Sequence, residues 1–230
     1  MTRLLVGSGA PVFALELDPG LVERLRELTR EHSNLTVVPG DVLQSDLRAI
    51  ASSRRIRLYG NLPYYITSPI LHHFFAYADL IDEAHIVIQL EVAERLTARP
   101  GSKSYGYLSV LTQFYARPEF VLRLPPGAFR PPPEVGSALI TLRLPGQRAR
   151  LTIQDDEGFF EFVRTCFTQK RKTLSNNLRD IAAPGQTRSL LRGLHLREDA
   201  RAEQLSVAEL AAVYQSISSA SSQAGRDSRT

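Results

Sequence analysis

The chain has 230 residues, 43% of them apolar, so it can bury one full hydrophobic core and a smaller second one. It has a formal net charge of +4, and its single cysteine, Cys166, excludes an internal disulfide and indicates a reducing compartment. No apolar run reaches the length of a membrane-spanning helix, and the five histidines show no metal-ligand spacing. These features predict a cytoplasmic protein that binds neither a membrane nor a metal ion.

The first third of the chain alternates strands and helices, which is typical of an open α/β sheet. A strand over 12–17 contains Glu16 at its end, and a strand over 35–38 leads toward Asp41 and Val42. In such sheets ligands bind beyond the carboxyl ends of the strands, where an acidic side chain can accept hydrogen bonds from ribose hydroxyls. Glu16 is therefore a candidate ribose ligand, and Asp41 with Val42 could bind an adenine ring. Taken singly, each feature is also typical of a solvated strand end or an ordinary turn.

The sequence Asn61-Leu62-Pro63-Tyr64 is expected on a loop between a strand and a helix. The exocyclic nitrogen of adenine is a poor nucleophile because its lone pair is delocalised into the ring. Two acceptors, the Asn61 side-chain oxygen and the Leu62 carbonyl, could hold both N–H groups and let the nitrogen aim its lone pair at a methyl donor. Pro63 would stiffen the loop, and Tyr64 would stack on the base. The alternative is that Asn61 caps the next helix and that the tyrosine belongs to the core.

The middle of the chain predicts the rest of the sheet. The expected strands are 56–59, 84–90, 120–124 and 137–144, the last two antiparallel, and the expected helices are 69–78, 92–98 and 105–116. Prolines on both sides of Phe129 would hold its loop stiff, which suits a ring that stacks on a base. The alternative for Phe129 is a core residue beneath the loop.

Beyond a junction at 145–150 the pattern becomes helical. Helices are expected over 159–168, 172–181, 188–194 and 207–217. Ser206 and Glu209 form a capping box at the start of the last helix, and the polar residues from 219 onward predict a disordered tail. A candidate phosphate-binding patch consists of Arg164, Lys170, Arg171, Lys172 and Arg179. The alternative for these basic residues is a solvated helix face.

Several blocks resemble the rRNA adenine N6-dimethyltransferase family. They are residues 16–18, 40–41, 61–69, 104–110, 129–135 and 167–174. The resemblance covers about residues 1–217 and is greatest to the bacterial members that dimethylate two adjacent adenines near the 3′ end of 16S rRNA. It implies a Rossmann-like class I S-adenosylmethionine-dependent methyltransferase domain over 1–147. It also implies a small all-helical RNA-binding domain over 148–218, followed by the tail over 219–230.

The resemblance also implies roles for individual residues. S-adenosylmethionine is the implied cofactor, and the implied partner is 16S rRNA within the pre-30S small ribosomal subunit. The implied roles are catalysis by Asn61, Leu62, Pro63 and Tyr64; cofactor binding by Glu16, Asp41, Val42 and Asn61; stacking on a flipped adenine by Tyr64 and Phe129; and RNA binding by Arg164, Lys170, Arg171, Lys172 and Arg179.

The sequence departs from the family at its beginning. The family opens with a Phe-Gly-Gln-Asn-Phe-Leu segment and a strand that leads into a Glu-x-Gly-x-Gly loop, and this sequence has neither. Residues 1–5 are expected to form the helix after that loop, and Gly7 and Gly9 do not replace it. We therefore expect an N-terminally truncated sheet that lacks a central strand, which exposes two ladders. Two other functions stay open: a 23S rRNA dimethyltransferase that confers antibiotic resistance, and an assembly factor or inactive fragment that binds pre-30S particles without methylating them.

Overall fold

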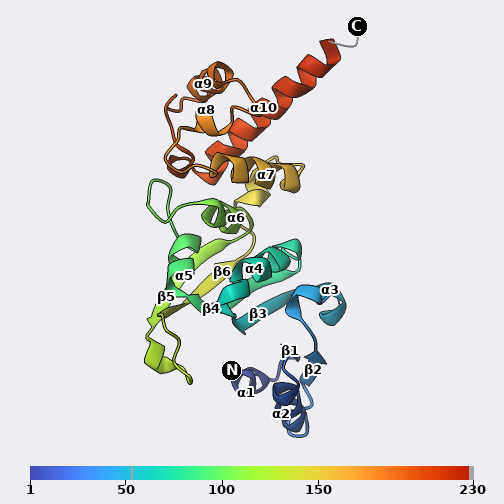
Figure 1. The fold of residues 1–230 in the computed structure, drawn as a ribbon. Coiled ribbons are helices and arrows are strands. Elements are labelled where there is room, and N and C mark those ends of the chain that lie inside the picture. Colours follow the sequence, from blue (N-terminus) through green and yellow to red (C-terminus); the bar gives the residue numbers. More distant parts are fainter. Residues whose placement is uncertain (53, 228–230) are drawn as a thin grey trace. The chain divides into compact units, whose positions relative to one another are not determined.

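The computed structural model describes the backbone of residues 1–52 and 54–227 and the side chains as far as Ser219, and its elements are labelled in Figure 1. The chain forms two compact units. Unit 1 consists of Met1–Ile56 and Tyr65–Ile81, and unit 2 consists of Arg57–Tyr64 and Asp82–Thr230. Each unit is described by itself below.

Unit 1 contains a two-stranded parallel sheet of β1 (Val12–Glu16) and β2 (Leu35–Pro39). Its helices are α1 (Thr2–Val6), α2 (Pro19–Thr29), η1 (Val42–Gln44), α3 (Leu47–Ile50) and α4 (Thr67–Ala76). The side chain of Asp18 caps α2 by accepting a hydrogen bond from the Leu21 N–H at 3.0 Å. Helix α2 buries Val22, whereas Leu21 is 44% exposed.

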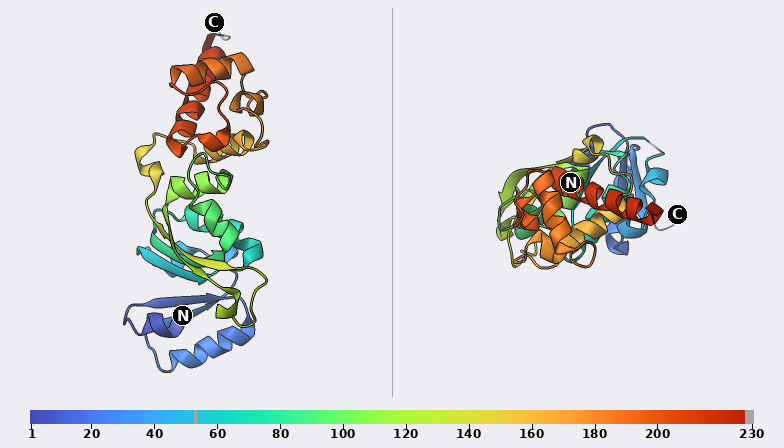
Figure 2. Two further views of the ribbon diagram at one scale, coloured as in Figure 1. Left: turned by 90° about the vertical axis from the view of Figure 1, so that its left-hand side faces the viewer. Right: turned by 90° about the horizontal axis from the view of Figure 1, so that it is seen from above.

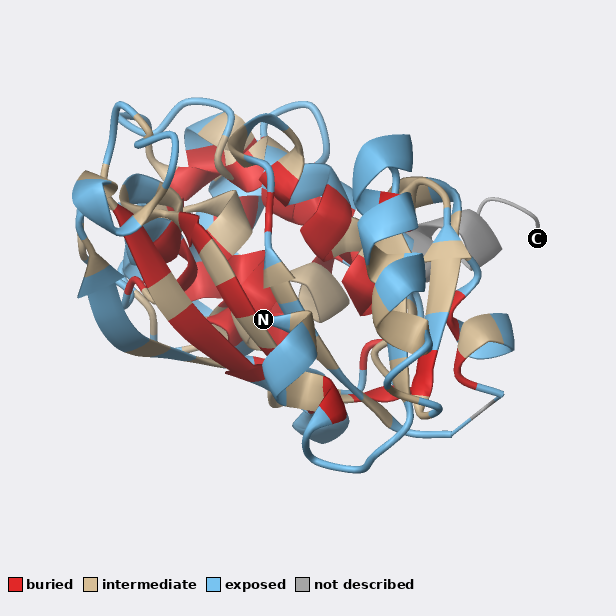
Figure 3. Ribbon diagram, turned by 90° about the horizontal axis from the view of Figure 1, so that it is seen from below, coloured by how far each residue is buried: buried red, intermediate tan, exposed pale blue. Residues whose placement is uncertain are grey.

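Unit 2 contains a four-stranded sheet in the order β3–β4–β6–β5. Its strands are β3 (Ile56–Asn61), β4 (Ile81–Gln89), β5 (Arg117–Leu124) and β6 (Ser137–Arg143). Strand β6 is antiparallel to both β4 and β5, as expected. Ile86 and Ile88 of β4 and Ile140 of β6 are fully buried on one face of this sheet, and buried residues are red in Figure 3. Helices α5 (Leu90–Leu96) and α6 (Tyr107–Tyr115) pack against β5 and β6.

The strands form two separate hydrogen-bonded ladders, as expected for a sheet that lacks a central strand. Strands β1 and β2 pair only with each other, and β3 lies at an edge of the other sheet. Among the described residues, no strand pairs with the second edge of β1 or of β3. The α/β class of the fold is also as predicted.

The C-terminal part of unit 2 is a helical module that Figure 2 shows in orange and red. Its helices are α7 (Asp156–Cys166), α8 (Leu174–Asn177), α9 (Pro184–Gly193), η5 (Ala202–Gln204) and α10 (Val207–Asp227), and the short helices η3 (Pro126–Ala128) and η4 (Gln147–Arg150) precede them. The predicted capping box is confirmed, since the Ser206 N–H donates to Glu209 Oε2 at 2.7 Å and the Glu209 N–H donates to Ser206 Oγ at 3.2 Å.

Two helices of this module differ from expectation. The helix predicted over 172–181 is reduced to the single turn α8. The Asn177 side chain donates to the carbonyl oxygens of Cys166 at 2.7 Å and Gln169 at 3.2 Å, which ties the chain to the preceding turn. Helix α10 continues to Asp227, through most of the segment for which the sequence predicts disorder, and residues 228–230 lie outside the described part.

An aromatic cluster joins the helical module to α6 within unit 2. The ring centroid of Phe159 on α7 lies 5.2 Å from that of Phe114 on α6 and 5.6 Å from that of Tyr214 on α10. Phe114 and Phe159 are both fully buried, and so is Cys166, whose burial raises the pKa of its thiol. Cys166 is therefore a packed core residue. No helix in the described part of the chain is both long and apolar enough to span a bilayer.

Candidate active site

The Asn61 loop begins where β3 ends. Asn61 is the last residue of the strand and is exposed, and its side chain makes no hydrogen bond to any described residue. The loop is fixed at the next residue, where the Leu62 N–H donates to the Val87 carbonyl of β4 at 2.9 Å and the Leu62 side chain is 8% exposed. The side-chain oxygen of Asn61 is therefore an available acceptor on a backbone that the neighbouring strand holds in place.

The alternative in which Asn61 caps the following helix is wrong. The N-cap of α4 is Ile66, which makes no side-chain capping bond, and η2 (Tyr64–Ile66) separates the Asn61 loop from this helix. The tyrosines are not core residues either, because Tyr64 is half-buried and Tyr65 is 87% exposed.

Tyr64 and Phe129 both lie in unit 2. The Tyr64 hydroxyl hydrogen-bonds the Ser137 hydroxyl at the start of β6. Phe129 is half-buried, and its loop is tightened where the Ala128 N–H donates to the Pro125 carbonyl at 2.9 Å. Each ring thus keeps some accessible surface, which a residue that stacks on a base requires.

Glu16 and Asp41 come together in unit 1. The carboxyl end of β1 is opposite that of β2, and the Gly40 N–H donates to the Glu16 carbonyl at 2.9 Å. Glu16 Oε1 accepts hydrogen bonds from the Leu17 and Asp18 N–H groups at 2.9 and 3.0 Å.

The Asp41 carboxylate is held in a similar way. Asp41 Oδ1 accepts from the Leu43 N–H at 2.9 Å, and the neighbouring Val42 is half-buried. Each carboxylate is oriented through one oxygen, while its other oxygen accepts no hydrogen bond from the described residues. This donor set fits the hydroxyl and amino groups of a nucleoside.

The five candidate RNA-binding residues are in different surroundings. Lys170, Arg171 and Lys172 are exposed, and no acidic side chain lies within ion-pair distance of them in the described part of the chain. The Arg164 guanidinium instead lies 5.3 Å from the ring centroid of Tyr107, and Arg179 Nε lies 3.7 Å from Asp180 Oδ1. Of the five residues, only Arg179 has an acidic side chain within ion-pair distance among the residues that the structure describes, and the three consecutive residues carry most of the uncompensated charge.

A second loop brings another basic residue to this cluster. The Lys170 ammonium group donates to the Lys103 carbonyl at 2.9 Å, and the Gly101 N–H donates to the Glu203 carbonyl at 2.7 Å. Tyr105 on the same loop is fully buried, and this burial raises the pKa of its hydroxyl. The helical module thus holds the loop between α5 and α6, and the exposed Lys103 extends the basic cluster.

The sequence interpretation missed Ser137 and Lys103. Ser137 follows directly after the Phe129 block, but its role depends on a contact with a residue 73 positions away. Lys103 is a single lysine in a polar loop, and only its contact with Lys170 distinguishes it.

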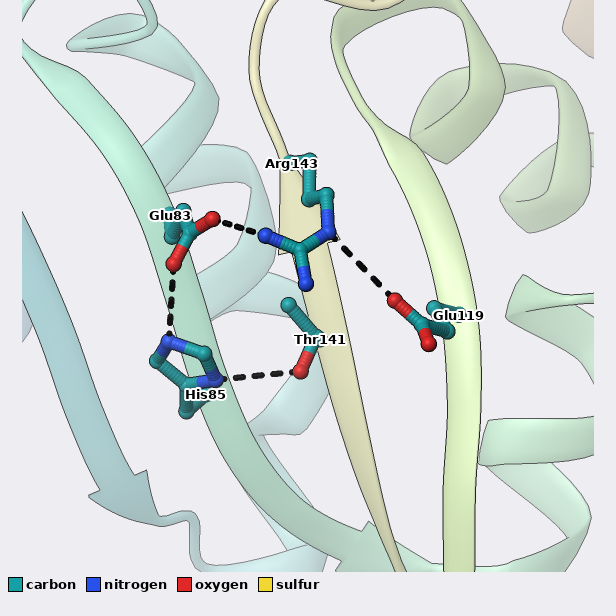
Figure 4. Close-up of polar contacts among 5 residues, drawn as sticks. All are labelled: Glu83, His85, Glu119, Thr141 and Arg143. Atoms are coloured by element: carbon teal, nitrogen blue, oxygen red, sulfur yellow. Dashed lines mark hydrogen bonds and ion pairs between the residues drawn. The ribbon is translucent and has the colours of Figure 1, made fainter.

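A polar network covers part of the four-stranded sheet away from these groups (Figure 4). His85 Nδ1 lies 3.0 Å from Thr141 Oγ1, its Nε2 lies 3.2 Å from Glu83 Oε2, and its ring stacks on Tyr59 at 4.9 Å. Arg143 is ion-paired with Glu83 and, at 3.3 Å, with Glu119. Each polar group has a partner within the network, so we assign it a structural role. No group of three His, Cys, Asp or Glu side chains in the described residues could hold a metal ion.

Comparison with protein families gives one match that covers nearly the whole chain. Residues 2–219 match the family described as Ribosomal RNA adenine dimethylase. A protein from Acidobacterium capsulatum named Ribosomal RNA small subunit methyltransferase A is 42% identical over 219 residues, which are 94% of this chain and 77% of the relative. A protein of the same name from Syntrophus aciditrophicus is 40% identical over 95% of this chain and 80% of the relative.

Two solved structures share the fold. A dimethyladenosine transferase from Plasmodium falciparum superposes with a TM-score of 0.78 at 20% identity, and the match covers 90% of this chain and 82% of that one. The 23S rRNA methyltransferase ErmE superposes with a TM-score of 0.67 at 25% identity and the same coverage. Both likenesses support the assignment of a Rossmann-like methyltransferase fold with an appended helical module.

Proposed function

Because the chain belongs to the ribosomal RNA adenine dimethylase family, we propose that it methylates N6 of two adjacent adenines near the 3′ end of 16S rRNA. The relatives at 40–42% identity are named as small-subunit rRNA methyltransferases, which supports 16S rRNA in the pre-30S particle as the substrate. We expect this reaction to take place in the cytoplasm, where small subunits assemble.

The observation that supports this function best is the exposed Asn61 amide on a fixed backbone. The Asn61 Oδ1 atom and the Leu62 carbonyl would accept hydrogen bonds from the two N–H groups of the adenine amino group. With both hydrogens held, the nitrogen can pyramidalise and direct its lone pair away from the ring. Each such bond contributes about 0.5–1.5 kcal/mol net, so most of the acceleration must come from alignment. The proton leaves after the nitrogen has become positively charged, so the site requires no general base in the ground state.

Tyr64 and Phe129 would hold the base on its two faces. Extruding an adenine from its stack costs a few kcal/mol, and an aromatic contact to a base contributes about 1–3 kcal/mol. Two such contacts are therefore sufficient to offset the extrusion, and the rings also fix the plane in which the amino group is presented.

S-adenosylmethionine is the cofactor that we propose. It would supply an electrophilic methyl group, and the residues proposed to hold it are Glu16, Asp41, Val42 and Asn61. Glu16 would accept hydrogen bonds from ribose hydroxyls, Asp41 from an adenine amino group, and Val42 would contact the adenine ring. The free carboxylate oxygens of Glu16 and Asp41 support these assignments.

The basic cluster of the helical module is proposed to bind the rRNA backbone. Lys170, Arg171 and Lys172 have no acidic partner among the described residues, so they keep their charge for phosphate groups. Arg164 and Arg179 would contribute less, because each is already engaged by Tyr107 or Asp180. We also propose that the methyltransferase domain covers 1–147 and the RNA-binding domain 148–218.

The proposed function is tested with undermethylated 30S subunits and radiolabelled S-adenosylmethionine. Asn61→Ala should reduce methyl incorporation by at least about a hundredfold, as removal of a preorganised hydrogen-bonding group at a reacting atom does elsewhere. Binding to the particle should be unchanged. Asn176→Ala, which alters an exposed asparagine of α8, is the matched control and should leave incorporation intact. Full activity of the Asn61 variant would refute the assigned role.

Calorimetry separates the enzyme from a factor that only binds particles. Titration with S-adenosylmethionine should give saturable binding, and Asp41→Asn should weaken it. Particle binding without cofactor binding would instead support the assembly factor. Methylation of 23S rRNA in place of 16S rRNA would support the third interpretation.

A further inference from the structure

The hydroxyl of Ser137 is a buried polar group whose partner belongs to the proposed active site. Ser137 is 0% exposed, and its Oγ hydrogen-bonds the hydroxyl of Tyr64. A buried hydroxyl without a partner costs about 1–3 kcal/mol, so this hydrogen bond is a strong constraint on the Tyr64 side chain.

Strand pairing on both sides fixes the position of Ser137. It is the first residue of β6, where it pairs with Gln89 of β4 and Leu124 of β5. The preceding residue is also held, because the Leu90 N–H donates to the Gly136 carbonyl at 2.9 Å. Ser137 is thus a rigid point at the start of an inner strand of the sheet.

Tyr64 has much less support of its own. It begins the short helix η2, it is half-buried, and the next residue, Tyr65, is 87% exposed. The hydroxyl of a tyrosine lies on the axis about which χ2 turns, so a contact there restricts χ1 and not the rotation of the ring about its own axis. The hydrogen bond to Ser137 therefore fixes where the Tyr64 ring lies in the site.

Ser137 also ends the segment that carries the second ring. The loop with Phe129 leaves β5 at Leu124 and rejoins the sheet at Ser137. One hydrogen bond thus joins the Asn61 loop to the end of the Phe129 loop, within the same unit.

We propose that Ser137 is a positioning residue for methyl transfer, which holds the Tyr64 ring in the place where it stacks on the target adenine. This inference rests on the proposed function. It predicts an effect on the rate of transfer in the bound complex, because a displaced ring still allows the rRNA to bind through the basic cluster. Loss of one neutral hydrogen bond should lower kcat about 3- to 10-fold and leave KM for the 30S particle nearly unchanged.

The test is a double-mutant cycle with Ser137→Ala, Tyr64→Phe and the double variant. Both single variants remove the same hydrogen bond, so each should lose about the same fraction of kcat, and the double variant should be no slower than either. Ser137→Thr retains the hydroxyl and should recover part of the rate. Tyr65→Phe removes the neighbouring exposed hydroxyl and should act as wild type.

The outcomes separate this inference from the proposed function. Absence of methylation by the wild type would refute the function itself, and the inference with it. With an active wild type, an unchanged kcat in Tyr64→Phe, or losses that multiply in the double variant, would overturn the inference alone. Circular dichroism establishes that each variant folds. If Ser137→Ala does not fold, the kcat of Tyr64→Phe alone tests the inference, because this variant removes the same hydrogen bond through a change at the half-buried Tyr64.

Discussion

The β1–β2 pair of unit 1 and the four-stranded sheet of unit 2 differ sharply in packing. Strand β1 has no fully buried residue, and its Phe13 is 43% exposed. In the larger sheet, Ile86 of β4 and Ile140 of β6 are each 0% exposed and lie opposite each other. A two-stranded sheet is marginally stable at best, whereas three or more strands with one covered face can be stable alone.

Because of this difference, the proposed cofactor ligands and the proposed base-binding residues are held by backbone that is packed to different degrees. The candidate cofactor ligands Glu16 and Asp41 lie at the carboxyl ends of the thinly packed strands β1 and β2. Asn61 ends β3, the edge strand of the larger sheet, and the loop after it is held by the buried Leu62 and by the hydrogen bond from Tyr64 to Ser137. Local opening costs least where few apolar contacts are buried. We therefore expect the base-binding loop to be rigid before substrate arrives, and the cofactor edge to be stabilised by its ligand.

The largest expected effect comes from core truncation in the two regions. Phe114→Ala should destabilise the protein by about 3–5 kcal/mol, because it removes a fully buried ring that touches Phe159. Phe13→Ala removes a ring of the same size from β1 and should cost less than about 1 kcal/mol. Urea unfolding followed by far-UV circular dichroism measures both. Equal losses would show that the packing contrast does not control stability.

The sequence could predict most of the elements of both regions. The alternation of Ile86, Ile88 and their partners is a local pattern, and the Ser206–Glu209 capping box depends on residues three positions apart. Such short-range rules predicted the strands, the order of the helices and the exposed position of Asn61 at a strand end.

What could not be predicted depends on long-range contacts. The hydrogen bond between Tyr64 and Ser137 joins residues far apart in sequence, and so does the contact of Lys170 with Lys103. The shortening of the helix predicted over 172–181 depends on Asn177 reaching back to Cys166.

Amide hydrogen exchange should also distinguish the two sheets, with a difference in the free energy of local opening that is smaller than the effect of Phe114→Ala. Amides of β4 and β6 should exchange at least about a hundredfold more slowly than those of β1 and β2, because local opening spans the range up to global unfolding. Saturating S-adenosylmethionine should slow exchange in β1 and β2, since a ligand at about a hundred times its Kd adds about 2.7 kcal/mol to any opening that releases it. Asp41→Asn is the matched control and should reduce this protection. Uniform exchange across both sheets would contradict the comparison.

The smallest effect that we expect to separate the regions comes from adding one methyl group at a glycine. A Cβ atom at Gly146 would lie 2.4 Å from the Ala116 nitrogen and 2.7 Å from the Phe114 carbonyl oxygen, and these backbone atoms cannot move independently. Gly146→Ala should therefore lower the free energy of unfolding by about 1–3 kcal/mol, as overpacking does.

The matched control in unit 1 is Gly7. Its φ is −63°, and a Cβ there would come no closer than 3.4 Å to any neighbour, the Leu4 carbonyl oxygen. Gly7→Ala should therefore be neutral or slightly stabilising. Thermal unfolding of the two variants measures both effects. If the Gly146 variant were as stable as the Gly7 variant, the junction between the sheet and the helical module would not be close-packed.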